Sequence, residues 1–388
     1  MKIVYVFRSL TIVGGVERIL IEKMNYLASL PGYEVTLITY EQGQHPIVFP
    51  LAQAVRHIDL GIEFYTRYRY GIVKRSYLYT ELLRRFKRAL KKHLQDIEPD
   101  VIVSTTYSPM EISTLCRIKG KAKWIIESHS AKGAIGKRAI QRSNLLMKLA
   151  ATVADWKLYR EIRQCDAFVA LTHADAQAWH KVKQAVVIPN MLTHFPQRAK
   201  DPAQTYKQVI SVGRLENQKG YDLLIEAWKH VAKKHRDWKL AIYGEGSDRT
   251  MLEERISSYG LKGKVILHPP TDRIYDKYME SDFYVMSSRY EGFGLVLAEA
   301  MSCGMPCVSF ACPHGPSDII MHTADGLLVP DGDTEQLAVS ICYMIENDEA
   351  RQQMGKRARM NIRRYLPEWV MPQWSRLFES LTTKQTHR

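Results

Sequence analysis

The sequence of 388 residues contains no apolar run that approaches the ~20 residues needed to span a bilayer. It also has no leader-like start, because the first apolar run, at 3–7, ends before Arg8. Cysteine is scarce: six residues are scattered without a CxxC pair or a zinc-binding spacing. We therefore expect reduced thiols, a cytoplasmic location, and only peripheral contact with any membrane.

The charge of the chain is unevenly distributed. The composition is 46% hydrophobic and 25% charged, which is typical of globular proteins, and the formal net charge is +14. Residues 1–196 contain 29 Lys or Arg against 16 Asp or Glu, whereas residues 197–388 contain 26 against 25. The basic first half indicates an anionic partner such as nucleic acid, a membrane surface or a phosphorylated ligand. We expect the two halves to meet different partners.

Strand-like and helix-like segments alternate in both halves of the chain. Short β-branched runs begin near 3, 34, 101 and 124, and a second series begins at 209 after the polar segment 196–208. Alternation of this kind predicts α/β domains, each with a parallel sheet covered by helices on both faces. We predict a first domain over 1–196 and a second over 197–365, facing each other across a ligand cleft.

Two glycine motifs follow predicted strands. Gly14 and Gly15 open the first helix, where backbone amides and the helix N-terminus suit a phosphate, although a tight turn is the simpler alternative. Gly244-Glu-Gly246 lacks the third glycine and the downstream acid of a dinucleotide-binding fingerprint. We interpret the second motif as a structural turn.

The segment 291–301 carries the most informative pattern. Glu291 and Glu299 lie eight residues apart, and glycines at 292 and 294 precede an apolar helix. Such a loop and helix N-terminus can bind a diphosphate, while Glu291 bonds an attached sugar and Glu299 takes ribose hydroxyls. The alternative is a core helix with one satisfied glutamate.

A pair of cations follows the strand at 209–212. Arg214 and Lys219 lie five residues apart on one loop. Arginine binds a diphosphate bidentately and lysine binds it as a point charge, so the pair could neutralise a leaving group. Ordinary surface cations are the alternative.

These motifs, in this order, resemble the GT-B glycosyltransferases of family 4 over nearly the whole chain. The matching residues are Gly14-Gly15-Val-Glu-Arg, His129 in Glu-Ser-His-Ser, Ile188-Pro-Asn190, Val212-Gly-Arg-Leu with Lys219-Gly, Gly244-Glu-Gly, and Glu291 with Glu299. The resemblance implies the GT-B fold: two Rossmann-like, doubly wound domains, with C-terminal helices (366–388) crossing back to the N-terminal domain.

The resemblance also implies retaining transfer of a hexose from a nucleotide-sugar, most plausibly a UDP-sugar. Arg214 and Lys219 would contact the diphosphate, Glu291 the sugar and Glu299 the ribose. His129 would lie beside the anomeric carbon. The remaining implied donor contacts are Gly14, Gly15, Gly292, Phe293, Gly294 and Leu295. The nucleotide-sugar is a substrate, and no cofactor is expected.

One departure from the family pattern and one possible metal motif lie between residues 312 and 333. Many relatives have Gly-Gly and Glu at the place where this chain has the stretch from Cys312 to Asp318. The variant in this chain resembles bacterial capsule and O-antigen glycosyltransferases. Asp331-Gly-Asp333 matches the DxD signature of metal-dependent glycosyltransferases. We interpret it as a surface turn because Asp-Gly pairs form turns and GT-B enzymes need no bound metal.

The segment 74–93 contains eight Lys or Arg and one acid. At helical spacing its leucines and Phe86 fall on one side and its cations on the other. The predicted basic face consists of Arg84, Lys87, Arg88, Lys91 and Lys92. It could meet anionic lipid headgroups or the pyrophosphate of a lipid-linked acceptor; a solvated helix face is the alternative.

We therefore expect a retaining glycosyltransferase at the inner face of a membrane, acting on a lipid-linked saccharide acceptor in cell-surface polysaccharide assembly. One alternative is another GT-B reaction, phosphorolysis or sugar-nucleotide epimerisation, which needs no sugar acceptor. The other is a nucleic-acid-binding module, which predicts cations interleaved with stacking aromatics on an exposed sheet. The cations here gather on a helix instead, so we expect no nucleic-acid partner.

Overall fold

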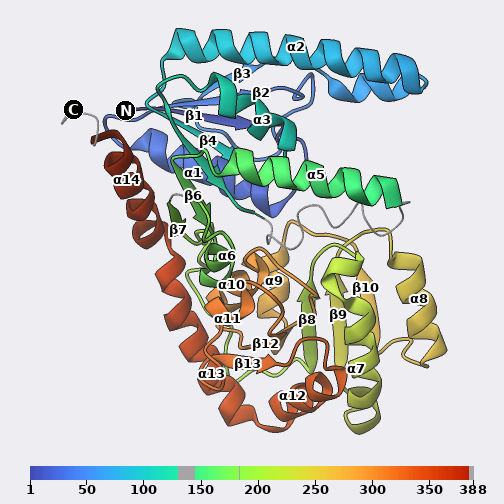
Figure 1. Cartoon of the computed structure of the whole chain (residues 1–388). Helices are drawn as coiled ribbons and strands as arrows, with labels where there is room; N and C mark the ends of the chain where they lie inside the picture. The colour runs from blue at the N-terminus through green and yellow to red at the C-terminus, as the bar shows by residue number, and fades with distance from the viewer. Residues whose placement is uncertain (130–144, 183, 384–388) are drawn as a thin grey trace. The chain divides into compact units, whose positions relative to one another are not determined.

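The computed structural model describes residues 1–129, 145–182 and 184–383, with only the backbone described for 145–151. The chain forms two compact units (Figure 1). Unit 1 contains residues 1–171, 175–188 and 371–388, and unit 2 contains 172–174 and 189–370. The main change of unit thus falls at 188/189 rather than at the expected 196/197, and the return to unit 1 begins at 371 rather than 366.

Unit 1 is built on a sheet of seven parallel strands in the order β3-β2-β1-β4-β5-β6-β7. The strands are β1 (Lys2–Phe7), β2 (Glu34–Thr39), β3 (Arg56–Asp59), β4 (Val101–Thr105), β5 (Lys123–Glu127), β6 (Ala167–Ala170) and β7 (Ala185–Val187). Its helices are α1 (Gly15–Ser29), η1 (Phe64–Arg69), α2 (Ile72–Ile97), α3 (Pro109–Ile118), α5 (Leu145–Ile162) and most of α6 (His173–Ala178).

Side chains that alternate along β1 reach two different layers of unit 1. Val4 and Val6 belong to the core beneath α2, α3 and α5. Tyr5 and Phe7 lie near Leu20 and Met24 of α1. Both faces of the sheet are therefore covered, which explains why its inner strands read as nearly continuous apolar runs.

Helix α2 is amphipathic, as its sequence predicts. Leu82, Phe86, Leu90 and Leu94 are buried in the core of unit 1. On the polar side the structure exposes Arg84, Arg88, Lys91 and Lys92. The predicted basic face of five cations was wrong in one member, Lys87. This lysine is half-buried and lines a cavity with residues of α3 and α5.

Unit 2 is built on six parallel strands in the order β10-β9-β8-β11-β12-β13. They are β8 (Gln208–Val212), β9 (Lys239–Tyr243), β10 (Val265–His268), β11 (Phe283–Met286), β12 (Cys307–Phe310) and β13 (Gly326–Val329). The helices are η3 (Asn217–Lys219), α7 (Tyr221–Lys234), α8 (Arg249–Ser258), α9 (Ile274–Met279), α10 (Leu295–Ser302), α11 (Pro316–Ile319), α12 (Thr334–Glu346), α13 (Asp348–Asn361) and η4 (Ile362–Tyr365). Helix α14 (Pro367–Thr383) begins in unit 2 and continues into unit 1.

The strand order reverses between β8 and β11, which are neighbours in the sheet although β9 and β10 come between them in sequence. Ligands of open parallel sheets bind outside the carboxyl ends of the strands at such a switch point. The loops that follow β8 and β11 are therefore the first place to look for a site in unit 2.

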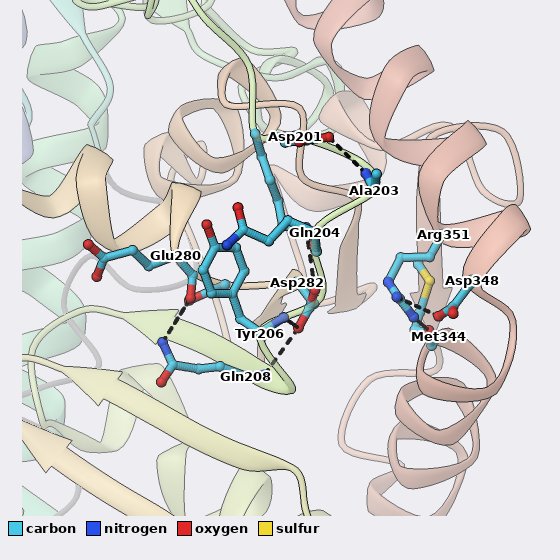
Figure 2. Close-up of polar contacts among 12 residues, drawn as sticks. Asp201, Ala203, Gln204, Tyr206, Gln208, Glu280, Asp282, Met344, Asp348 and Arg351 are labelled. Atoms are coloured by element: carbon cyan, nitrogen blue, oxygen red, sulfur yellow. Dashed lines mark hydrogen bonds and ion pairs between the residues drawn. The ribbon is translucent and has the colours of Figure 1, made fainter.

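The polar segment that leads into β8 is anchored to unit 2. One carboxylate oxygen of Asp282 accepts hydrogen bonds from the backbone amides of Tyr206 at 3.0 Å and Gln208 at 3.1 Å (Figure 2). The other lies 3.3 Å from the ammonium of Lys200, and both side chains are largely buried. The entrance of β8 is thus fixed to the residue that precedes β11.

Within the described residues, no helix is both long and apolar enough to cross a membrane.

Candidate functional site

The loops after β8 and β11 are joined by hydrogen bonds. Ser287 donates its hydroxyl to the carbonyl of Lys219 at 3.0 Å, and Arg289 donates its amide to Gln218 at 2.8 Å. Gly220 makes this approach possible: its φ is 62°, and a Cβ there would lie 2.1 Å from the carbonyl oxygen of Ser287. A side chain at 220 would separate the two loops.

This junction brings together two residues singled out from the sequence. The ammonium of Lys219 lies 2.7 Å from Oε1 of Glu291, and the same oxygen accepts a 2.6 Å hydrogen bond from Ser288. The side chains of Lys219 and Glu291 are only 16% and 7% exposed. A lysine held so firmly at a strand end can present its charge to a diphosphate without first being ordered.

Arg214 is placed differently from Lys219. Its side chain is 61% exposed and pairs with Glu216 of the same loop at 3.0 Å. The guanidinium is free of the core, so it can exchange Glu216 for a ligand phosphate at low cost. The β8 loop therefore carries one largely buried cation, Lys219, and one exposed cation, Arg214.

Residues 292–295 form the entrance of α10. Gly294 is the N-cap, with a φ of 94°, and Leu295 begins the helix. The ring of Phe293 is buried and packs edge-on against Tyr365, with ring centres 5.2 Å apart. The free amides of the first turn carry partial positive charge and are the backbone donors expected for a phosphate.

Glu299 lies two turns into α10 and is half-buried. Tyr278 of α9 donates its hydroxyl to Oε2 of Glu299 at 3.4 Å. Burial and the charge of Glu299 raise the pKa of Tyr278 well above its ordinary value, so the phenol stays protonated and available as a donor. This tyrosine was not identified from the sequence.

A second unpredicted contact braces the β11 loop. The guanidinium of Arg289 binds both carboxylate oxygens of Asp222 in α7, at 2.8 and 2.7 Å. Bidentate pairs of this kind fix orientation as well as charge. Arg289 and Asp222 therefore support the loop that carries Glu291.

Two other motifs have structural explanations in unit 2. A Cβ at Gly244 would lie 1.9 Å from the carbonyl oxygen of Gly213, so the Gly-Glu-Gly segment lets two strand-end loops touch. Asp333 accepts a 2.9 Å hydrogen bond from the amide of Gln336 and caps α12. The DxD-like segment is thus a turn and a helix cap, as its sequence favours.

One group of side chains has the spacing of a metal site within the described parts of the chain. Ligand atoms of His235, Cys342 and Glu346 lie within 4.8 Å of one another, at the ends of α7 and α12. Lys234 already binds Glu346 at 2.7 Å, and this ion pair competes with a metal ion for the carboxylate.

In unit 1, Gly14 is the N-cap of α1 and Gly15 its first residue, both after β1. The carboxylate of Glu17 lies beside Gly14. An acidic side chain near a helix N-terminus is stabilised by the helix dipole, so it competes there with a ligand phosphate. The phosphate contact expected at these glycines remains a prediction.

His129 lies two residues beyond the end of β5, in a buried polar cluster. Its Nε2 is 3.0 Å from Oε2 of Glu127, which also binds the ammonium of Lys23 in α1. The ammonium in turn lies 4.4 Å from the ring centre of Trp374 in α14. The cluster thus ties α14 to α1 and β5 within unit 1.

The protonation of this cluster follows from burial and charge. Burial opposes ionisation of Glu127, but Lys23 and His129 outweigh it and lower the pKa of the carboxyl. Burial lowers the pKa of His129 below its ordinary value, against the attraction of Glu127. A neutral imidazole must then donate Nε2–H to the carboxylate, which leaves the lone pair on Nδ1. Within the described residues, Nδ1 has no hydrogen-bond partner.

Lys23 and Glu127, the two residues that form the buried cluster with His129, were not identified from the sequence. Glu127 stands in the Glu-Ser-His-Ser motif, two positions before His129, so alternation along a strand end could have linked the two. Nothing in the sequence marks Lys23, which looks like an ordinary charge on α1.

Two family models together match most of the chain. Residues 13–193 match the family described as Glycosyltransferase Family 4, and residues 195–361 match that described as Glycosyl transferases group 1. The junction between the matches lies close to the change from unit 1 to unit 2.

Several of the similar proteins are named as glycosyltransferases. An uncharacterized glycosyltransferase of Haemophilus influenzae is 26% identical, over 96% of this chain and 98% of its own. An α-1,4-N-acetyl-D-galactosaminyltransferase of Campylobacter jejuni, named for a diNAcBac-PP-undecaprenol-linked acceptor, is 23% identical over 97% and 98%. The amylovoran biosynthesis glycosyltransferase AmsD of Erwinia amylovora is 33% identical over 45% of this chain, a match that spans 48% of the length of AmsD.

Solved structures show the same fold. Sucrose-phosphate synthase from Thermosynechococcus elongatus superposes with a TM-score of 0.79 at 20% identity, covering 99% of both chains. TarM of Staphylococcus aureus, solved with UDP, α-GlcNAc-glycerol and fondaparinux, superposes with a TM-score of 0.75 at 17% identity, covering 97% of this chain and 99% of its own. The chain belongs to the GT-B glycosyltransferases of the family 4 type and is a hexosyltransferase.

Proposed function

We propose that this enzyme transfers a hexose from a UDP-sugar, with retention of anomeric configuration, to a lipid-linked saccharide during cell-surface polysaccharide assembly. The donor binds in unit 2, at the strand ends of β8 and β11. The acceptor belongs to unit 1, whose sequence carries the excess of positive charge.

The observation that carries the donor assignment is the Lys219–Glu291 pair beside the entrance of α10. Departure of a nucleotide diphosphate leaves negative charge on the leaving oxygens. The largely buried ammonium of Lys219, the exposed guanidinium of Arg214 and the helix amides would all stabilise that charge. Ser288 and Lys219 fix the carboxylate of Glu291, which can then accept hydrogen bonds from sugar hydroxyls.

The choice of UDP and of retention is supported by the family. TarM was solved with UDP bound, and its fold matches nearly the whole of this chain. Unit 2 supplies a carboxylate at Glu299 whose place in α10 suits a ribose, held there by Tyr278. Retention of configuration is what the family 4 resemblance implies.

The lipid-linked acceptor is supported by the relative from Campylobacter jejuni, whose name specifies an undecaprenyl pyrophosphate-linked glycan. AmsD, another relative, is named for biosynthesis of amylovoran. The exposed cations Arg84, Arg88, Lys91 and Lys92 of α2 provide a surface for anionic lipid. Each cation near such a surface contributes ~1 kcal/mol to association, so four would hold the enzyme reversibly at the inner face of the membrane.

A screen of nucleotide-sugars tests this function. A bound donor raises the unfolding temperature because it binds only the folded state, so UDP-sugars should stabilise the enzyme more than ADP- or GDP-sugars. The stabilising donor is then incubated with and without a lipid-linked saccharide, and NMR of the product gives its anomeric configuration. Transfer only with acceptor, and with retention, supports the proposal. Phosphorolysis or epimerisation without acceptor, or an inverted product, contradicts it.

A further inference from the structure

Unit 1 contains a cavity of about 300 Å³ that the donor site does not use. It lies among α2, α3 and α5, and its walls come from all three helices. A volume of this size lies at the lower end of small-molecule pockets, which run from ~300 to 1,000 Å³. The lining residues used below are Leu83, Lys87, Met110, Arg117, Lys157 and Leu158.

The cavity has an apolar floor. Leu158 of α5 is buried in the core of unit 1, and Leu83 of α2 and Met110 of α3 pack against that core while partly exposed. Leu83 and Met110 thus present partly exposed aliphatic surface next to the buried Leu158. An aliphatic chain placed here would be removed from water by contact with all three.

Cations surround the opening. Lys87 is half-buried, and Arg117 and Lys157 are exposed. Glu161 is the one acid among the lining residues, and it lies 3.9 Å from Arg117. Lys87 and Lys157 have no ion pair with any described residue, so two cations remain available to an anion at the mouth.

Two of the three hydroxyl groups that line the cavity are already used, and the third is that of Tyr79. Ser113 donates to Oε1 of Glu161 at 2.7 Å, and Thr114 donates to the carbonyl of Met110 at 2.9 Å. The side-chain polar groups that remain in the lining are the Tyr79 hydroxyl and four charged groups, three of them cations, which suits an anion better than a neutral sugar or nucleobase. An anionic head on an aliphatic chain needs only charge and apolar surface, and both are present.

We propose that the cavity among α2, α3 and α5 binds a lipid phosphate: the chain lies on Leu83, Met110 and Leu158, and the phosphate is bound by Lys87 and Lys157. The cavity lies wholly within unit 1 and the expected donor residues Arg214, Lys219 and Glu291 within unit 2, so this inference does not depend on the identity of the donor. It gives Lys87 a role distinct from that of the exposed cations on the same helix.

Calorimetric titration with three probes tests the site. Geranyl phosphate carries both chain and charge, geraniol only the chain, and inorganic phosphate only the charge. Geranyl phosphate should bind saturably and at least about tenfold more tightly than either of the others, because each of them lacks one half of the contacts. Equal binding of geraniol, equal binding of inorganic phosphate, or no saturable binding of geranyl phosphate would overturn the proposal.

Variants locate the binding. Lys87→Gln with Lys157→Gln should weaken geranyl phosphate binding by about tenfold or more, and Ala154→Trp should block the cavity from its exposed edge. The matched control, Arg56→Gln with Lys121→Gln, removes two exposed cations of unit 1 that do not line the cavity and should bind as the wild type does. UDP binding reports separately on unit 2 and should be unchanged throughout. If the control loses binding as much as the cavity variants do, the phosphate is attracted by the surface charge of unit 1 in general and the cavity is not the site.

Discussion

The ammonium of Lys219 lies 2.7 Å from Oε1 of Glu291, although the two residues are separated by 72 positions in sequence. Neither side chain is well exposed, so each charge depends on the other for compensation. A donor diphosphate that approaches Lys219 would therefore share the lysine with a carboxylate that is itself expected to bind the sugar. On the proposed function, the pair would couple the two ends of the donor.

The two carboxylates of the donor site should respond differently to the same substitution. Glu291→Gln should lower the turnover number by about 100-fold with little change in UDP affinity, since it alters a contact to the sugar. Glu299→Gln should weaken UDP binding by about tenfold, because a charged hydrogen bond to the ribose is lost. Steady-state kinetics and calorimetry with free UDP separate the two. Wild-type UDP affinity in Glu299→Gln would remove the ribose assignment.

Much of unit 2 could be predicted because its motifs follow strands closely. A glycine, a cation or an acid placed just after a β-branched run lies at the carboxyl edge of a parallel sheet, whatever the sheet order. Arg214, Lys219 and Glu291 were found in this way, and the structure brings Lys219 and Glu291 together. The fold class followed from the same alternation of strands and helices.

The contacts that the sequence did not reveal depend on tertiary packing. Lys23 meets Glu127 only because α1 packs on the sheet beside β5, and no local pattern encodes that approach. The angular spacing of residues along a helix predicts Lys87 on the same face as the exposed cations. In the structure, however, α3 and α5 pack on the side of α2 that carries Lys87. Short strands such as β7, with three residues, carry too little pattern to be recognised.

The buried His129 makes the stability of the enzyme sensitive to acid. Its folded-state pKa is lowered, so below about pH 6.5 the unfolded chain binds a proton that the folded chain refuses. Stability contributed by the neutral imidazole is therefore present above that pH and declines as the pH falls, by at most ~1.4 kcal/mol per pH unit. Denaturant unfolding at pH 7 and pH 5 measures the decline.

His129→Gln should show a smaller loss of stability between pH 7 and pH 5 than the wild type. His57 and His268 also have lowered pKa values, caused by partial burial, so only the difference between the two proteins reports on residue 129. Identical pH dependence in both proteins would show that the imidazole is not held neutral by burial.

Asp333 should matter for stability and not for transfer. Asp333→Ala removes the cap of α12 and should cost about 1 kcal/mol of unfolding free energy, while turnover stays near the wild-type value.

Transfer should also persist in EDTA, because Arg214, Lys219 and the entrance of α10 are expected to carry the leaving-group charge. Loss of activity in EDTA that Mg²⁺ restores, together with an inactive Asp333→Ala, would instead make this aspartate a metal ligand.

The exposed face of α2 should bind anionic membranes. Replacing Arg84, Arg88 and Lys91 with Gln removes about 3 kcal/mol of attraction, or roughly 100-fold in affinity, and should abolish sedimentation with anionic liposomes. The KM for a lipid-linked acceptor should rise, and UDP binding should not change. Lys356→Gln with Arg357→Gln removes exposed cations of α13 and serves as the control. Unchanged sedimentation of the α2 variant would leave this face as ordinary solvated surface.

The most direct test of the donor site compares UDP with uridine by calorimetry in wild type, Lys219→Ala and the control Arg273→Ala, which removes an exposed cation paired with Asp276. The ammonium of Lys219 should contribute to binding only through the diphosphate. Lys219→Ala should therefore bind UDP at least about tenfold more weakly than wild type while uridine binding stays the same, and Arg273→Ala should change neither. A folded Lys219→Ala variant that binds UDP as tightly as the wild type would contradict the assignment of the β8–β11 junction as the diphosphate site.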